Sequence, residues 1–156
     1  MNNSRRIFLR AALASSTVAI AVSAGLLTPR TVLAAWPKKA FEAKDEQTAL
    51  SELLGGTDLT ASGNVVVKTP DIAENGAVVS ITVEQKVPGA ESISVLVTEN
   101  PTKLAANFNL SKQASSFIIC RVKMRKTSDV IAVVKAGGKL YSGTGRVKVT
   151  LGGCGG

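Results

Sequence analysis

The carboxyl terminus of this 156-residue chain places a single cysteine, Cys154, between two pairs of glycines, Gly152-Gly153 and Gly155-Gly156. Glycine has no side chain and the widest choice of backbone conformations, so this ending predicts a thin, flexible arm over residues 152–156. An extended chain from Leu151 to Cys154 spans about 10 Å. Such an arm suits the insertion of one thiol into a narrow channel of another protein.

The chemistry of Cys154 favours a carrier over an autonomous enzyme. A reactive cysteine usually lies beside a helix N-terminus, a cation or a histidine, and none of these adjoins Cys154 in the sequence. The nearby C-terminal carboxylate disfavours the thiolate, so we expect activation to come from the enzyme that receives the arm. A thiol on such an arm can form a persulfide, an S-thiosulfonate or a mixed disulfide and present it elsewhere.

The composition excludes several other kinds of site. The chain contains no histidine, which excludes Ser-His-Asp and Cys-His nucleophile pairs and histidine-ligated zinc. We therefore predict that the protein has no catalytic residue, no metal and no resident cofactor. Aromatic residues make up only 4% of the chain, so a base-stacking surface for single-stranded nucleic acid is not expected.

The N-terminus has the pattern of an export signal. Paired arginines, Arg5 and Arg6, precede an apolar stretch over residues 11–27 that Ser and Thr interrupt. The arrangement S-R-R-x-F-L-R is typical of a twin-arginine signal, which a receptor reads as an address and which is not an anchor. Small residues then predict cleavage after Ala34 or Ala35.

Cleavage of residues 1–34 would leave a periplasmic protein without a membrane segment. The removed segment carries four arginines and no acid, so the formal net charge falls from +8 to +4. A charge of this size favours solubility, and no long basic run in the mature chain predicts DNA binding. The alternative is a membrane anchor or a core helix over residues 5–34, which the short, Leu-poor apolar run disfavours.

The mature chain is expected to form a mainly β domain over residues 35–151. One helix is predicted over residues 37–54, with Pro37 in its first turn and Gly55-Gly56 as its stop. Seven runs rich in Val, Ile and Thr follow, separated by turn signals such as Asn75-Gly76. These runs cover residues 64–69, 77–87, 92–98, 105–110, 116–126, 130–135 and 139–151. Seven short strands predict a β-sandwich.

The second cysteine, Cys120, lies in the predicted strand 116–126. Strand alternation predicts that its side chain points into the core, where a cysteine usually behaves as a small hydrophobic residue with an inert thiol. The residues that share its face are Ile118, Val122 and Met124. The opposite face carries three basic residues, Arg121, Lys123 and Arg125. We expect this basic face to be solvated, with docking to an acidic partner as the alternative.

The chain resembles the SoxY family, the sulfur-carrier subunits of the bacterial Sox system that oxidises thiosulfate. The resemblance begins at the Gly-Gly-Cys-Gly-Gly ending around Cys154 and extends over nearly all of the mature chain. It covers residues 40–44, 72–79, 107–110, 121–124, 130–136 and 139–142. The twin-arginine signal agrees with it.

The resemblance implies an immunoglobulin-like antiparallel β-sandwich and a non-catalytic carrier that binds thiosulfate-derived intermediates covalently on Cys154. It also implies a heterodimer with the small subunit SoxZ. The cytochrome SoxAX would join thiosulfate to the thiol oxidatively, the hydrolase SoxB would release sulfate, and in some organisms a sulfane dehydrogenase would oxidise the remaining sulfur. Cys120 departs from the family pattern, in which a small hydroxyl residue is usual, and leaves open a Cys120–Cys154 disulfide as an off-state.

Two other classes of protein stay open as interpretations of this sequence. The terminal Gly155-Gly156 resembles the ends of ubiquitin-like sulfur carriers, but their activation consumes ATP in the cytoplasm, whereas this chain carries an export signal. Alternatively, the protein is a periplasmic scaffold that binds other proteins, and its tail is structural or redox-regulatory.

Overall fold

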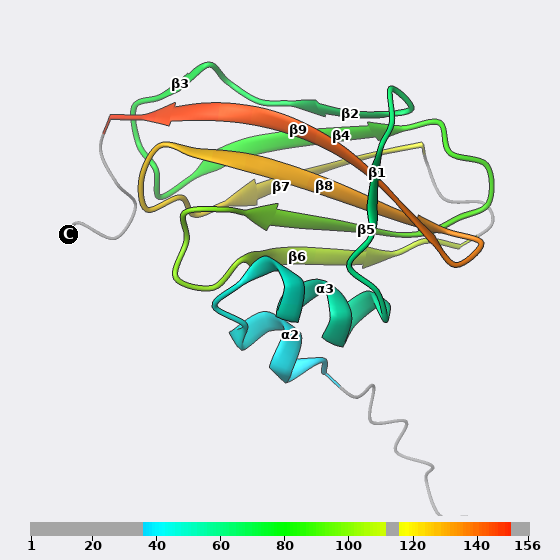
Figure 1. The fold of residues 1–156 in the computed structure, drawn as a ribbon. Helices are drawn as coiled ribbons and strands as arrows, with labels where there is room; N and C mark the ends of the chain where they lie inside the picture. The colour runs from blue at the N-terminus through cyan, green and yellow to red at the C-terminus, as the bar shows by residue number, and fades with distance from the viewer. Residues whose placement is uncertain (1–35, 112–115, 151–156) are drawn as a thin grey trace, which may run out of the picture. The chain divides into compact units, whose positions relative to one another are not determined.

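A computed structural model describes residues 36–111 and 116–150 (Figure 1). These residues form two short helices and nine strands. The helices are α2 (Lys38–Glu42) and α3 (Glu46–Leu54). The strands are β1 (Leu59–Ala61), β2 (Val65–Lys68), β3 (Ile72–Ala73), β4 (Val79–Gln85), β5 (Ala90–Val97), β6 (Leu104–Asn109), β7 (Phe117–Val122), β8 (Ser128–Ala136) and β9 (Lys139–Val149).

The strands form two sheets that pack face to face. One sheet has six strands, in the order β1-β9-β8-β5-β6 with β3 paired to β9, and the other has three, in the order β2-β4-β7. The long pairings β5–β6, β5–β8, β8–β9, β2–β4 and β4–β7 are all antiparallel. The predicted mainly β, immunoglobulin-like sandwich is therefore confirmed.

The main core lies between the two sheets. It joins Ile81 and Val83 of β4 to Ile93 and Val95 of β5 and to Val134 of β8. All five side chains are fully buried, and each one contributes about 1.5–3 kcal/mol by leaving water. Because side chains alternate along a strand, the neighbours of these residues point to the outer face of each sheet.

The helices cover the outer face of the six-stranded sheet. Along β8, Val134 lies in the main core, whereas Val133 packs in a second core with Leu96 of β5 and with Leu50 and Leu54 of α3. Both faces of β5 and β8 are therefore buried, which explains their nearly continuous apolar sequences. Among the described residues, neither helix is long and apolar enough to cross a membrane.

The prediction of one helix over residues 37–54 is wrong, because the chain breaks it into α2 and α3. Ala43 is extended, with φ −62° and ψ 132°, and ends α2. Asp45 then caps α3, since its carboxylate accepts a hydrogen bond of 2.7 Å from the backbone N–H of Thr48. The predicted stop at Gly55 is confirmed, because Gly55 is left-handed with φ 78°.

Two short strands were not expected. β1 pairs in parallel with β9 at Leu140–Ser142, and β3 pairs in parallel with β9 at Lys148–Val149. They contain three and two residues, too few for an alternating pattern to be recognised. The sheet therefore has two parallel pairings in addition to the expected antiparallel ones.

Strand β2 passes very close to β9 at Gly143. A Cβ atom at position 143 would lie 2.1 Å from the carbonyl oxygen of Val65, so no other residue fits without a backbone shift. The approach is less close at Gly145, where a Cβ would make a tight contact of 3.2 Å with the carbonyl oxygen of Val67. Two glycines of β9 thus let one edge of the three-stranded sheet close against the six-stranded sheet.

Candidate functional site

The predicted attachment site lies outside the described residues. This is true of Cys154 and of the four arm glycines, Gly152, Gly153, Gly155 and Gly156. It is also true of Arg5 and Arg6 of the signal motif. The structure does describe the strand that leads into the arm, as far as Thr150, and therefore the base from which the thiol is presented.

The end of β9 is held on one side by β3. Beyond the parallel pair Ala73–Val149, the backbone N–H of Thr150 donates a hydrogen bond of 3.1 Å to the carbonyl oxygen of Ala73. The hydroxyl of Thr150 donates another, of 3.2 Å, to the carbonyl oxygen of Glu74. The last described residue is therefore held by its main chain to β3 and by its side chain to Glu74, the residue that follows β3.

Thr127 holds the other side of the same strand end. Its hydroxyl accepts a hydrogen bond of 3.0 Å from the backbone N–H of Val149. The last pair between β8 and β9 is Ser128–Val147, so Thr127 extends the contact beyond the regular ladder. Nothing in the sequence indicated this role, because only the fold brings residue 127 beside residue 149.

This anchoring limits where the thiol can go. Cys154 is four residues beyond Thr150, and an extended chain of that length spans at most about 14 Å. Any molecule that reacts with Cys154 must therefore reach the end of the sandwich where β9 ends. That end also carries the β5–β6 and β7–β8 connections (Figure 1).

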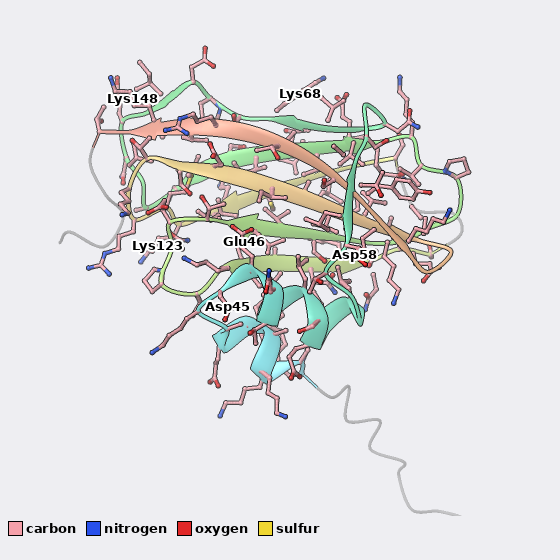
Figure 2. All side chains as sticks on the ribbon, viewed as in Figure 1. Asp45, Glu46, Asp58, Lys68, Lys123 and Lys148 are labelled. Carbon is pink, nitrogen blue, oxygen red and sulfur yellow. The ribbon has the colours of Figure 1, made fainter. Side chains whose placement is uncertain are left out.

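The base of the arm carries charges of both signs. Lys126 lies 2.7 Å from Glu99, and its hydrogen bond lowers the pKa of that carboxyl; Arg146 lies 3.1 Å from Asp129. Figure 2 shows Lys148 and Lys123 at this end. At this end of the sandwich, the cations that form no ion pair with a described residue include Lys123, Arg125 and Lys148, and the acids that form none include Asp71 and Glu74. The surface around the arm is thus mixed, with a slight excess of positive charge.

Cys120 lies on β7 and packs against the main core, as predicted from strand alternation. It is only half-buried, because β7 is the edge strand of its sheet and pairs with β4 alone. Burial raises the pKa of the Cys120 thiol, so little thiolate is present at neutral pH. Cys120 forms no disulfide within the described part of the chain, and the alternative pairing with Cys154 lies outside it.

Within residues 36–111 and 116–150, no three His, Cys, Asp or Glu side chains gather where they could hold a metal ion. What the described residues provide is an end of β9 that is hydrogen-bonded on both sides as far as Thr150.

The chain was compared with curated proteins and with solved structures, and the solved structures include both weak and strong matches. No curated protein matches the chain. A lytic polysaccharide monooxygenase from Jonesia denitrificans is 12% identical over 60% of this chain and 58% of its own, with a TM-score of 0.37. A PKD domain of an M14-like peptidase from a Thermoplasmatales archaeon is 17% identical over 55% of this chain and 94% of its own, with a TM-score of 0.38. Similarity at this level supports no conclusion about this chain.

One solved structure is much more similar. The sulfur carrier protein SoxY from Chlorobium limicola f thiosulfatophilum is 37% identical, with a TM-score of 0.60. The similarity covers 66% of this chain and 94% of that protein. A sequence model of the family described as "Sulfur oxidation protein SoxY" matches residues 50–154, a range that ends at the cysteine of the arm. The chain therefore belongs to the SoxY family of sulfur oxidation proteins.

Proposed function

We propose that this protein is a periplasmic sulfur carrier that binds thiosulfate-derived intermediates covalently on Cys154 and presents them to the enzymes of a Sox cycle. The observation that carries the proposal is that the SoxY family match extends to residue 154. The geometry supports the proposal as far as it is described, because β9 is hydrogen-bonded up to Thr150, four residues before Cys154.

The proposed chemistry uses Cys154 as a point of attachment only. Its thiolate and the outer sulfur of thiosulfate form a sulfur–sulfur bond, and the two electrons released pass to the cytochrome SoxAX. Water then cleaves the bond between the outer sulfur and the sulfonate group on SoxB, which releases sulfate and leaves a persulfide on Cys154. Both catalysts lie outside this chain, and the chain itself has no histidine to act as a proton shuttle.

The proposed location and partners rest on the sequence. The twin-arginine pattern at Arg5 and Arg6 supports export to the periplasm in a folded state. Membership of the SoxY family supports a heterodimer with SoxZ and transient docking with SoxAX, SoxB and, in some organisms, a sulfane dehydrogenase. No resident cofactor is proposed, because the sulfur intermediates are a transient modification of the cysteine.

The test is the intact mass of the protein, measured without reductant after purification from the periplasm of thiosulfate-grown cells. We expect sulfur or thiosulfate-derived adducts that a reductant removes and that peptide mapping places on Cys154. A Cys154→Ser variant should carry no adduct and should abolish thiosulfate oxidation in a reconstituted system. A Cys120→Ser variant, as the matched control, should keep both.

Two results would contradict the carrier function. A bare thiol, or a mass lower by two hydrogens that joins Cys120 to Cys154, would favour the scaffold with a structural or redox-regulatory tail. Full activity of Cys154→Ser would do the same. Removal of Gly155-Gly156 should spare thiol loading, whereas activation at the terminal carboxylate, as in ubiquitin-like carriers, would require both glycines.

A further inference from the structure

The connection between β7 and β8 concentrates positive charge beside the base of the arm. Its residues, 123–127, read Lys-Met-Arg-Lys-Thr, with three cations and no acid. Lys126 pairs with Glu99 at 2.7 Å. Lys123 and Arg125 are exposed and form no ion pair with a described residue. This connection, called the basic loop below, therefore presents two unpaired cations to the solvent.

The backbone of the basic loop is held in place by two neighbouring connections and by the core. The side-chain amide of Asn100, in the β5–β6 connection, donates a hydrogen bond of 2.7 Å to the carbonyl oxygen of Lys123. It also accepts one of 3.0 Å from the backbone N–H of Arg125. The backbone N–H of Met124 donates a hydrogen bond of 2.7 Å to the carbonyl oxygen of Gly76, and the Met124 side chain is fully buried. The two unpaired cations thus extend from a fixed backbone.

The basic loop also adjoins the base of the arm. Its last residue, Thr127, accepts the hydrogen bond from the backbone N–H of Val149, and Figure 2 shows Lys123 at the end of the sandwich where β9 ends. The Cα atoms of Arg125 and Lys123 lie within about 7 Å and about 14 Å of the Cα atom of Thr127, because they are two and four residues away. These distances are similar to the reach of the arm, about 14 Å. A protein that receives the thiol therefore comes close to both cations.

The charge of the basic loop indicates what borders the receiving site. Carboxylates complement exposed Lys and Arg side chains, and opposite charges at the rim of an interface speed association. In the proposed function SoxAX takes free thiosulfate, a dianion that a border of carboxylates would repel. The hydrolase SoxB takes the sulfonate only on the arm and releases sulfate, which a border of carboxylates would help to leave. The hydrolase is therefore the partner whose chemistry fits the basic loop.

We propose that the basic loop docks on carboxylates that border the entrance to the active site of the hydrolase SoxB. The inference rests on the proposed function, in which this enzyme cleaves the sulfonate group from the loaded arm. Lys123 and Arg125 have two effects in this complex. They speed the association of the loaded carrier with the enzyme, and they offset the repulsion between the enzyme's carboxylates and the anionic sulfonate on the arm.

The test measures hydrolysis of the loaded carrier by purified SoxB at several salt concentrations. The substrate is the mature protein together with SoxZ, and all forms carry Cys120→Ser so that only Cys154 is loaded. Tetrathionate loads it without SoxAX, because the Cys154 thiolate attacks an inner sulfur of tetrathionate, forms the S-thiosulfonate and expels thiosulfate.

Two equivalent substitutions are compared with this Cys120→Ser parent. Arg125→Glu reverses one charge of the basic loop, and Lys139→Glu makes the same change in net charge far from it. Lys139 is exposed and forms no ion pair with a described residue. It begins β9, about 33 Å along the strand from Val149.

We expect Arg125→Glu to lower kcat/KM at least about tenfold at low salt through a higher KM, with kcat unchanged. The difference should shrink at high salt, because added ions screen charges at the rim of an interface. Lys139→Glu should change kcat/KM less than about twofold. Arg125→Gln removes the charge without reversing it and should give a smaller loss in the same direction. Because the Arg125 side chain is exposed, all variants should keep the melting temperature of the parent.

The outcomes separate this inference from the proposed function. If SoxB hydrolyses the parent and Arg125→Glu equally well, or if Arg125→Glu and Lys139→Glu lose the same activity, the basic loop is not the docking element while the carrier function stands. If kcat falls at every salt concentration and KM does not change, the loop acts on the position of the arm and the inference is overturned. If Arg125→Glu slows oxidative loading by SoxAX as much as hydrolysis, the hydrolase is not the partner. If Cys154 carries no adduct in thiosulfate-grown cells, the proposed function fails together with the inference.

Discussion

The hydroxyl of Thr127 accepts a hydrogen bond from the backbone N–H of Val149 at 3.0 Å, beyond the last residue pair of β8 and β9. On its other side Val149 pairs with Ala73 of β3. The strand that leads into the arm is thus held from both flanks up to its last residues. For the proposed carrier this matters, because movement at the base would enlarge the volume that the Cys154 thiol samples.

Replacing Thr127 by Val should loosen this base. The substitution keeps the shape of the side chain and removes the hydroxyl, so the N–H of Val149 loses its partner. We expect a decrease of about 1 kcal/mol in the free energy of unfolding. Amide hydrogen exchange at Val149 and Thr150 should become faster, whereas exchange in the middle of β8 should not change.

The matched control for this variant is Thr82→Val. Thr82 lies on the outer face of β4, and its side chain makes no hydrogen bond to a described residue. Its substitution should leave exchange at Val149 unchanged. Equal effects of the two variants would show that the Thr127 hydroxyl does not hold the strand.

Gly143→Ala should be among the most damaging small substitutions in the domain. The added Cβ would lie 2.1 Å from the carbonyl oxygen of Val65, so β2 and β9 must separate. We expect a loss of about 1–3 kcal/mol or more in the free energy of unfolding, measured by urea denaturation. Gly63→Ala is the control, because no atom lies within 4 Å of a Cβ at that position. Similar losses for both variants would contradict the close approach of the two strands.

The strands could be predicted where their own residues favour a β-strand. β4 and β8 are rich in β-branched residues and lie within or close to their predicted ranges. β1 and β3 could not be predicted, because they are strands only through their pairing with β9, far away in the sequence. The break between α2 and α3 was missed because residues 42–48 contain no glycine or proline, and only the cap at Asp45 marks the new start.

The site could be predicted only in part. The prediction of Cys154 as the attachment site came from its position between two pairs of glycines and from the family resemblance, and it stays a prediction because Cys154 lies outside the described residues. The position of Cys120 followed from alternation, but its partial exposure depends on β7 being an edge strand. Ile119 is exposed because the helices cover the six-stranded sheet and not the sheet that contains β7. No local sequence pattern indicates which sheet the helices cover.

The cap of α3 should make part of the stability depend on pH. The hydrogen bond from the backbone N–H of Thr48 lowers the pKa of the Asp45 carboxyl below its usual 3.8. A carboxyl whose pKa is lower in the folded state stabilises the fold above its unfolded pKa, and this contribution is lost as pH falls through the folded value. Asp45→Ala should therefore lower the melting temperature by a few degrees at neutral pH.

The difference in melting temperature between wild type and Asp45→Ala should shrink below about pH 4, where the wild-type carboxylate becomes protonated. Asp58→Ala is the control, because Asp58 is exposed and lies outside both helices, in the connection to β1. A difference that stays constant from pH 7 to pH 2 would mean that the charge of Asp45 does not contribute to the cap.

The two cysteines should differ strongly in reactivity. Burial raises the pKa of the Cys120 thiol, and the half-buried side chain packs against the main core, so both ionisation and access limit its alkylation. At pH 8 we expect iodoacetamide to modify Cys120 at least about tenfold more slowly than Cys154, as followed by peptide mass spectrometry. The rate at Cys120 should rise with pH, and in urea the two rates should converge. Equal rates in the folded protein would mean that the core does not protect Cys120, and a disulfide with Cys154 would then be open to it as an off-state of the carrier.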